Sequence, residues 1–387
     1  MMIKENLTSR SIRNNNSYNI LKALVEHEKL QRSELTAFSK VSVITVKKIV
    51  DELLRAGILE ETTVTSNIGR KPKELSFVQN LGCFCCVNLC KTSQIGYFIY
   101  DIHSRLLSEG KVKVGRYSDF SDALDESLLL IRKTVTEDLK LPLLGAAVSV
   151  PSIYYEEEDA VNCDLIPGLK DVHLKALLTE KLGIQNAVII HDVCAAAGLE
   201  YQLADSESLY YLYVGDGLGS AFVRCGEIFQ GDSCAAGEIG QCLTHFDGIE
   251  RSYESILSVS GLCEQLGVPD QGELEAMLLK YPDLPDNQLK ILKRVLNFAA
   301  EMLYNICWLL NPGSIVVDSS LPVLAGLIRE AASEKCELLS KSPIRNKVKV
   351  TLPREKNHYA MLGCMNLLVD NWIEEILDGA ASADCRR

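Results

Sequence analysis

The sequence predicts an α/β protein in two parts, a winged helix-turn-helix at residues 1–80 and a two-lobed α/β body at residues 81–387. Three observations indicate this. Helical periodicity fills the first part and ends in a β-prone hairpin. Apolar runs alternate with helical stretches in the second part. Residues 1–80 hold 13 Lys and Arg against 9 Asp and Glu, whereas the whole chain has a net charge of −12.

The first eighty residues predict three helices followed by a hairpin. A first helix covers 17–27, and a second covers 32–40 with Ser33 as its N-cap. Ser42 caps a third helix that Gly57 closes, and the stretch to residue 77 forms two short strands around a polar turn. The side chains expected in the core are Ile20, Leu21, Leu24, Val25, Leu35, Phe38, Val46, Ile49, Val50, Leu53 and Leu54.

The DNA-contact face is predicted on the third helix and on the hairpin that follows it. In a helix-turn-helix the outward N-terminal positions of this helix enter the major groove. Lysines there would contact phosphates, while threonine and aliphatic side chains would touch base edges or thymine methyl groups. Arg70 is the candidate for the minor groove, where arginine is favoured. The predicted contacts are Arg32, Ser42, Val43, Ile44, Thr45, Lys47, Lys48, Arg70 and Lys71.

Two other interpretations of this segment stay open. A winged-helix module can serve for contact with another protein, and any single lysine can be a solvated surface charge. The basic excess of residues 1–80 within an acidic chain favours nucleic acid as the partner.

The body predicts strands alternating with helices in two lobes. No apolar run is long enough to span a membrane, and the polar N-terminus lacks the apolar core of a signal peptide, so we expect a cytoplasmic protein. A strand here would place Cys83 and Cys85 on one face and Cys86 and Cys90 on the other, which is poor geometry for one metal ion. The strands are expected at 83–89, 96–101, 145–150, 186–190, 209–215 and 314–318, and the helices at 121–139, 172–182, 287–310 and 322–340.

Three segments of the body carry a resemblance to a known family. HDVCAAAGLE at 191–200, VGDGLGSAFV at 214–223 and AAGEIGQ at 235–241 resemble, in order and spacing, the ROK family of sugar kinases and repressors. The N-terminal segment, with its GRKP element at 69–72, is similar to the winged helix-turn-helix of ROK repressors. The resemblance implies an actin-like, ribonuclease H-like body of two lobes with a sugar site.

The nucleotide side of the family pattern is altered in this sequence. No glycine occurs between Gly82 and Gly96, where the family has its first phosphate loop. In the second loop Asp216 places a carboxylate where a hydroxyl would serve the phosphates, and like charges disfavour phosphate binding. A glycine run expected near the adenine is replaced by Asp318-Ser319-Ser320. We therefore predict a protein that is not an enzyme, without nucleotide or other cofactor.

The sugar side is partly retained. Asp192 matches the family's base, and His191 replaces the family's asparagine before it. The resemblance assigns effector contacts to His191, Asp192, Glu238, Gln241 and Glu254. The family's zinc site is expected to be absent, since Gln241, His245, Asp247 and Ser252 occupy the positions of its ligands.

The resemblance implies a transcriptional regulator, with repression of carbohydrate-metabolism genes favoured by family analogy. It would bind double-stranded operator DNA as a homodimer or homotetramer and respond to a sugar that it does not phosphorylate. Two alternatives remain, a DNA-binding protein whose body only oligomerises without a ligand, and a ROK sugar kinase with an added head.

Overall fold

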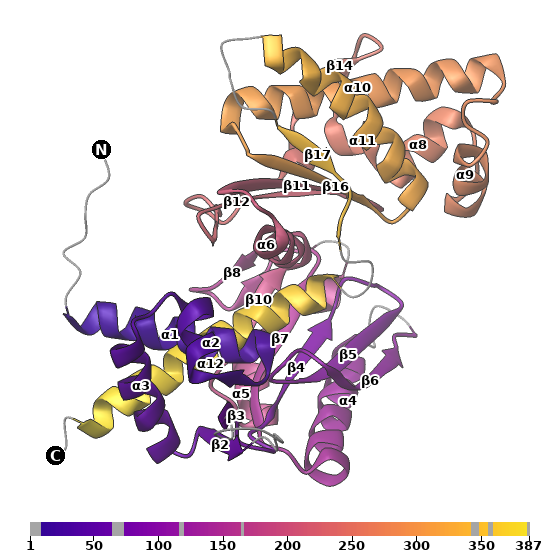
Figure 1. Cartoon of the computed structure of the whole chain (residues 1–387). Helices are drawn as coiled ribbons and strands as arrows, with labels where there is room; N and C mark the ends of the chain where they lie inside the picture. Colours follow the sequence, from indigo (N-terminus) through magenta and orange to yellow (C-terminus); the bar gives the residue numbers. More distant parts are fainter. Residues whose placement is uncertain are drawn as a thin grey trace. The chain divides into compact units, whose positions relative to one another are not determined.

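The computed structural model describes residues 9–63, 73–115, 120–163, 166–341, 348–354 and 359–384 (Figure 1). The chain divides into two compact units. Unit 1 comprises residues 1–150, 156–189 and 364–387, and unit 2 comprises residues 151–155 and 190–363. The expected head at residues 1–80 is therefore grouped with the first part of the body in unit 1.

The N-terminal segment forms the predicted helices and hairpin. Strands β2 and β3 pair antiparallel, with Leu59 opposite Phe77, and β1 completes a three-stranded sheet in the order β1-β3-β2. Helix α3 turns its apolar stripe inward, and Val46, Ile49, Val50 and Leu53 are buried. The elements are α1 (Ser9–His27), β1 (Leu30–Gln31), α2 (Arg32–Ser39), α3 (Val43–Arg55), β2 (Leu59–Thr63) and β3 (Lys73–Phe77).

Two local predictions for α2 were wrong. The helix begins one residue before Ser33, because the backbone N–H of Gln31 donates to the Glu34 carboxylate at 2.7 Å in a capping-box arrangement. Phe38 is 51% exposed and stacks against His27, with the ring centroids 4.0 Å apart. Its periodicity matched a core position, but Leu35 and Ser39, four residues apart, are the buried positions of α2, and Phe38 lies beside that stripe.

The rest of unit 1 is built on a mixed five-stranded sheet in the order β10-β7-β4-β5-β6. Strand β4 pairs in parallel with β7 and antiparallel with β5. Burial of β4 raises the pKa of the Cys83 thiol to about 12, so this thiol stays protonated. The elements are β4 (Cys83–Asn88), β5 (Gln94–Asp101), β6 (Leu106–Lys113), α4 (Phe120–Lys133) with a π-helical end (Thr134–Leu139), β7 (Leu143–Val150), β9 (Ala160–Val161), a 3-10 turn (Pro167–Leu169), α5 (Leu174–Leu182), β10 (Ala187–His191) and α12 (Tyr359–Asp384), which begins in unit 2.

Unit 2 has a second five-stranded sheet, in the order β13-β12-β11-β16-β17. Strands β11 and β16 are parallel, as expected for strands joined through helices. One face of this sheet packs against α6 through Val193, Ala197 and Tyr211. The elements are β8 (Tyr154–Tyr155), α6 (Asp192–Leu203), β11 (Ser208–Val214), β12 (Leu218–Arg224), β13 (Glu227–Ile228), a 3-10 turn (Ile239–Gln241), β14 (Leu243–Phe246), β15 (Ile249–Ser252), α7 (Tyr253–Leu257), α8 (Val259–Leu266), α9 (Gln271–Leu278), α10 (Asp286–Leu310), β16 (Ser314–Ser319), α11 (Pro322–Glu337), a 3-10 turn (Leu338–Lys341) and β17 (Lys349–Thr351).

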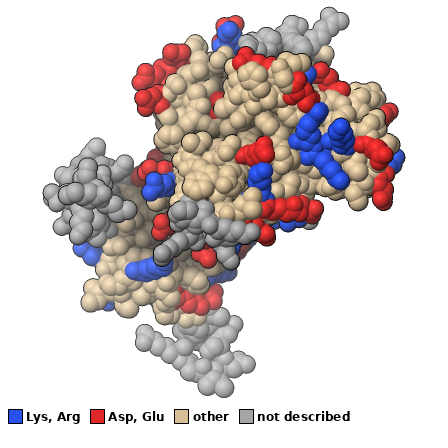
Figure 2. All heavy atoms as spheres, turned by 90° about the horizontal axis from the view of Figure 1, so that it is seen from above, with Lys and Arg blue, Asp and Glu red and all other residues tan. Residues whose placement is uncertain are grey.

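Two surface properties bear on function. Acidic side chains form several separate groups over the face seen in Figure 2, in keeping with the net charge of −12. Within the described ranges, no helix is both long and apolar enough to cross a membrane.

Candidate DNA-binding head and effector site

Helix α3 presents its predicted contact residues on the side away from the core. Ser42 caps the helix, since its hydroxyl accepts the backbone N–H of Thr45 at 3.3 Å and lies 2.8 Å from the Thr45 hydroxyl. Val43 and Ile44 are 70% and 84% exposed. Two adjacent aliphatic side chains so exposed are unfavourable in water, and burial against a partner would stabilise them. Lys47 and Lys48 are exposed on the same helix.

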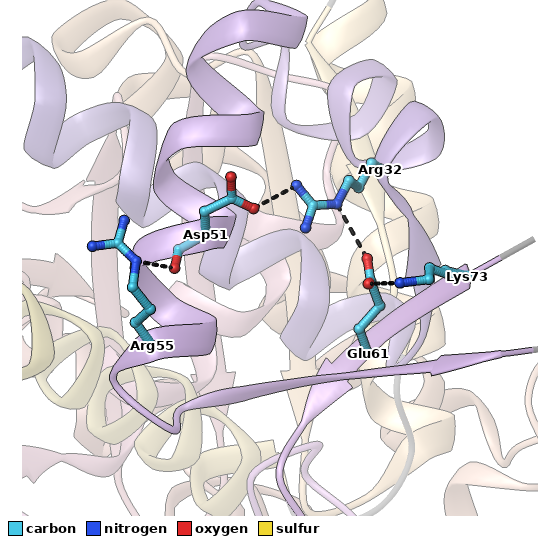
Figure 3. Close-up of polar contacts among 5 residues, drawn as sticks. All are labelled: Arg32, Asp51, Arg55, Glu61 and Lys73. Atoms are coloured by element: carbon cyan, nitrogen blue, oxygen red, sulfur yellow. Dashed lines mark hydrogen bonds and ion pairs between the residues drawn. The ribbon is translucent and has the colours of Figure 1, made fainter.

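Arg32 lies between two carboxylates of the head (Figure 3). Its Nη1 is 2.9 Å from Asp51 Oδ1 on α3, and its Nε is 3.3 Å from Glu61 Oε1 on β2. Lys73 of β3 reaches the other Glu61 oxygen at 2.6 Å. The hydrogen bond from Lys73 and then that from Arg32 hold the pKa of Glu61 below its usual 4.5, although burial opposes this. These contacts join α2, α3 and the hairpin.

The sequence prediction for Arg32 named DNA as its partner and missed these two carboxylates. Nothing local in the sequence pairs residues 32, 51 and 61, so only the folded head identifies them. Arg70 and Lys71, the predicted contacts at the hairpin turn, lie outside the described residues.

His191, Asp192 and Glu238, three of the residues predicted to contact an effector, come together in unit 2, and we call them the effector group on the strength of that prediction. His191 ends β10 and Asp192 begins α6. The Nε2 atom of His191 lies 3.3 Å from Asp192 Oδ1, and its Nδ1 lies 3.8 Å from Glu238 Oε1. All three side chains are partly exposed, so a ligand can reach them. Carboxylates and an imidazole so placed can bind hydroxyl groups through charge-assisted hydrogen bonds.

Backbone contacts position Glu238. Gly237 precedes it with a φ of +98°, and an added Cβ there would overlap the carbonyl oxygen of Ser220. The Ser220 hydroxyl donates to the Gly237 carbonyl at 2.7 Å and accepts from the Tyr210 hydroxyl at 2.7 Å. The GEIG segment is therefore fixed to β11 and β12. Sequence reasoning found Glu238 but missed the Tyr210–Ser220–Gly237 support.

Glu254 and Gln241 do not join the effector group through any contact between the described side chains. Glu254 Oε2 accepts the backbone N–H of Leu218 at 3.0 Å and lies beside the Gly215–Gly219 turn. Gln241 is exposed at the end of a 3-10 turn. Their sugar-contacting roles stay predictions, and the geometry gives Glu254 a second role as a brace for the glycine turn.

At the positions of the family's two phosphate loops, backbone amides of this chain are paired with other groups of the chain. The N–H of Leu89 donates to the Ser149 carbonyl and that of Cys90 to the Asn88 side chain, both at 2.9 Å. At the second turn Glu254 already takes the N–H of Leu218, and Asp216 is exposed nearby. Amides that are already paired, beside two carboxylates, are poorly suited to hold a phosphate anion.

The residues at the family's zinc positions do not fit zinc. Asp247 pairs with Arg294 at 2.6 Å, and the Ser252 hydroxyl caps α7 by accepting the Ser255 N–H. His245 is exposed on β14. Among the residues that the structure describes, no three His, Cys, Asp or Glu side chains form a group that could hold a metal ion.

A head of three helices and a small three-stranded sheet, followed by an α/β body that has a five-stranded sheet in each of the two units, defines the class of the protein. The model of the ROK family matches residues 116–371, and the chain belongs to that family. The family prediction made from the sequence is thereby confirmed.

Comparisons with individual proteins agree with this assignment. The chain is 22% identical to the xylose repressor of Caldicellulosiruptor bescii, over 92% of this chain and 95% of that protein. Among solved structures, a ROK family transcriptional regulator described as a homologue of the Escherichia coli MLC protein superposes with a TM-score of 0.72 at 19% identity, covering 95% of this chain and 99% of that chain. A ROK hexokinase from Thermus thermophilus gives a TM-score of 0.60 at 17% identity, over 74% of this chain and 97% of that chain.

Proposed function

We propose that this chain is a sugar-responsive transcriptional repressor. The observation that carries the proposal is the exposed N-terminal part of α3, with Val43, Ile44, Lys47 and Lys48 facing away from the core of the head. The relative named xylose repressor matches this chain over 92% of its length, which supports repression and makes xylose the first sugar to test.

The head would place α3 in the major groove of operator DNA. Thr45, Val43 and Ile44 would contact base edges, and Lys47 and Lys48 would contact phosphates. Arg70 and Lys71 complete the proposed contact set. Since one head covers one half-site, we propose a homodimer or homotetramer on a palindromic operator.

The effector would be a neutral sugar. The effector group holds two carboxylates, Asp192 and Glu238, with His191 between them. These acceptors suit sugar hydroxyls, whereas a phosphorylated sugar would meet like charge. Ligand binding would then favour one of two states of the protein and change its affinity for the operator.

The test is binding of the purified chain to its own upstream intergenic DNA, followed by fluorescence anisotropy. The titration is repeated over a range of salt, and with xylose, glucose and their phosphates. We expect salt-steep binding that xylose or another neutral sugar weakens, with no effect of the phosphates. Tight binding that no sugar alters would instead support the alternative in which the body only oligomerises.

A kinase activity is the second candidate, because Asp192 occupies the position of a catalytic base. We propose that it does not operate, since the amides of Leu89, Cys90 and Leu218 are already paired. A coupled assay of ATP turnover with each sugar tests this. Sugar-dependent turnover that Asp192→Asn abolishes would overturn the proposal.

A further inference from the structure

Helix α12 holds the head within unit 1. The Tyr18 hydroxyl of α1 donates to Asp370 Oδ1 at 2.8 Å, and Lys22 Nζ lies 2.6 Å from the same oxygen. Trp372, two residues after Asp370 in α12, is buried. Its ring packs between Phe77 of β3 and Phe84 of β4, with ring centroids 5.6 and 6.0 Å from its own. The head is therefore packed on α12 through both a helix and a strand.

The other end of α12 touches the helix that carries the effector group. Within unit 2, Gly363 lies against the backbone carbonyl of Ala195 in α6, and an added Cβ would overlap that oxygen. Asp192 begins α6 and precedes Ala195 by about one helical turn. The first turn of α6 thus supplies both an effector-group carboxylate and the carbonyl in contact with α12.

Between these two contacts α12 is continuous and firmly packed. It is one helix from Tyr359 to Asp384. The buried Asn186 side chain donates to the Leu368 carbonyl at 3.1 Å, and Met365 and Leu368 are fully buried. A close-packed helix moves as a unit rather than deforming locally, so a displacement at one end is felt at the other.

We propose that α12 communicates occupancy of the effector group to the head, with Gly363 and Asp370 as positioning residues at its two contacts. The inference rests on the proposed function. A ligand that binds Asp192 shifts the first turn of α6. Because the Ala195 carbonyl meets Gly363 with no side chain between them, α12 follows, and Asp370 and Trp372 carry the change to α1 and β3. By linkage, operator binding weakens sugar binding by the same factor.

The test uses the full chain and four variants. Gly363→Ala forces α12 away from α6, and Gly326→Ala in α11 is its control because an added Cβ there meets nothing within 4 Å. Asp370→Ala removes both contacts to α1, and Glu375→Ala removes an exposed carboxylate on the same helix. For each protein, operator affinity is measured with and without saturating xylose, or whichever sugar acts on the wild type.

The expected result is weaker coupling with both binding steps retained. In the wild type and the two controls, sugar should lower operator affinity by about tenfold, within the usual range of allosteric coupling. In Gly363→Ala and Asp370→Ala, the ratio of operator affinity without sugar to that with sugar should fall below about twofold. If this ratio is unchanged in both variants, the proposed coupling through α12 is wrong, while the proposed function is unaffected. If no sugar changes the operator affinity of the wild type, both the proposed function and the proposed coupling through α12 are wrong.

A spectroscopic measurement keeps the proposal testable if Gly363→Ala does not fold. The sequence has two tryptophans, Trp308 and Trp372. In Trp308→Phe the remaining indole lies between the head and the first strand of the body. Sugar should change the emission of Trp372, and the sugar concentration at half of that change should equal the concentration that releases half of the DNA. Asp370→Ala should abolish the change in emission. Emission that saturating sugar leaves constant would overturn the proposal.

Discussion

The hydroxyl of Tyr18 donates a hydrogen bond to the carboxylate of Asp370 at 2.8 Å, although 352 positions separate the two residues in the chain. The contact joins the first and last helices that the structure describes. Burial, and then the nearby Asp370 charge, raise the pKa of the Tyr18 phenol above its usual 10.0. Tyr18 therefore remains a hydrogen-bond donor throughout the neutral range.

This hydrogen bond should break at alkaline pH. A pKa raised in the folded state means that the stabilisation is fully present below about pH 10 and disappears as pH rises further. Tyr18→Phe should cost about 1 kcal/mol at pH 7, the usual net value of one hydrogen bond. Urea unfolding followed by Trp372 emission in a Trp308→Phe background measures both effects. The difference in stability between the protein with Tyr18 and the Tyr18→Phe variant should close above pH 10, and a constant difference would contradict the assignment.

Lys47 and Lys48 should contribute to DNA affinity without reading sequence. Replacing either with Ala should reduce the slope of log affinity against log salt by about 0.9 for each phosphate interaction that the substitution removes. The reduction in affinity should be equal on operator and unrelated DNA. Lys133→Ala, which removes an exposed lysine from α4, is the control. A reduction confined to the operator would instead make the lysine a base contact.

Arg32 should stabilise the head more than it binds DNA. Arg32→Ala leaves Asp51 and Glu61 without their shared partner, and partly exposed ion pairs of this kind contribute about 1 kcal/mol or less each. We expect a lower urea midpoint and an unchanged salt slope of DNA binding. Arg55→Ala, at an exposed arginine that bonds only the Asp51 carbonyl among the contacts in Figure 3, is the control. If Arg32→Ala reduces the salt slope of DNA binding and leaves the urea midpoint unchanged, Arg32 is a phosphate contact as the sequence predicted.

Acid should weaken the same network. The hydrogen bonds from Lys73 and Arg32 hold the pKa of Glu61 below 4.5. For a depressed carboxyl pKa the stabilisation is present above the unfolded value and is lost as pH falls through the folded one. Glu61→Gln should therefore be less stable than wild type at pH 7, with a difference that narrows below pH 4.5. Chemical unfolding at pH 7, 5 and 4 tests this. A difference in stability that widened in acid would mean that folding raises the pKa of Glu61 instead of lowering it.

Glu238 should act on sugar and not on DNA. Glu238→Gln removes the charge 3.8 Å from the His191 ring and weakens one acceptor for a sugar hydroxyl. A hydrogen bond to a charged group is worth about 1.5–3 kcal/mol, so sugar affinity should fall roughly 10- to 150-fold. Operator binding without sugar should not change. Calorimetry with sugar and anisotropy with DNA separate the two, with Glu264→Gln on the exposed side of α8 as the control.

Local sequence patterns predicted the helices of the head, but in the body they missed α6 and the long C-terminal helix α12. The apolar stripe of α3 is buried at Val46, Ile49, Val50 and Leu53, and Ser42 caps the helix as expected. The same periodicity placed Phe38 in the core, where the structure leaves it exposed. Periodicity reports which side chains share a helix face, but which of two neighbouring positions is covered by another element depends on packing, and in α2 it is Ser39 that is buried.

The candidate site also has a part that sequence motifs predicted and a part that only the structure shows. Motifs identify Asp192 and Glu238, and the fold brings both to the ring of His191. The family resemblance also points to Glu254, yet its carboxylate accepts the Leu218 N–H and braces the glycine turn. A motif identifies the residue type at a position, whereas the direction of the side chain follows from the backbone around it.

The sequence by itself determined the α/β class, the helices and hairpin of the head, six strands of the body and the family. These follow from spacing, caps and motifs that lie within a few residues of one another. Only the tertiary structure decided that Arg32 meets Asp51 and Glu61, and that Tyr18 meets Asp370. Such partners are remote in the chain, and their approach depends on the packing of whole helices and sheets, which no local pattern records.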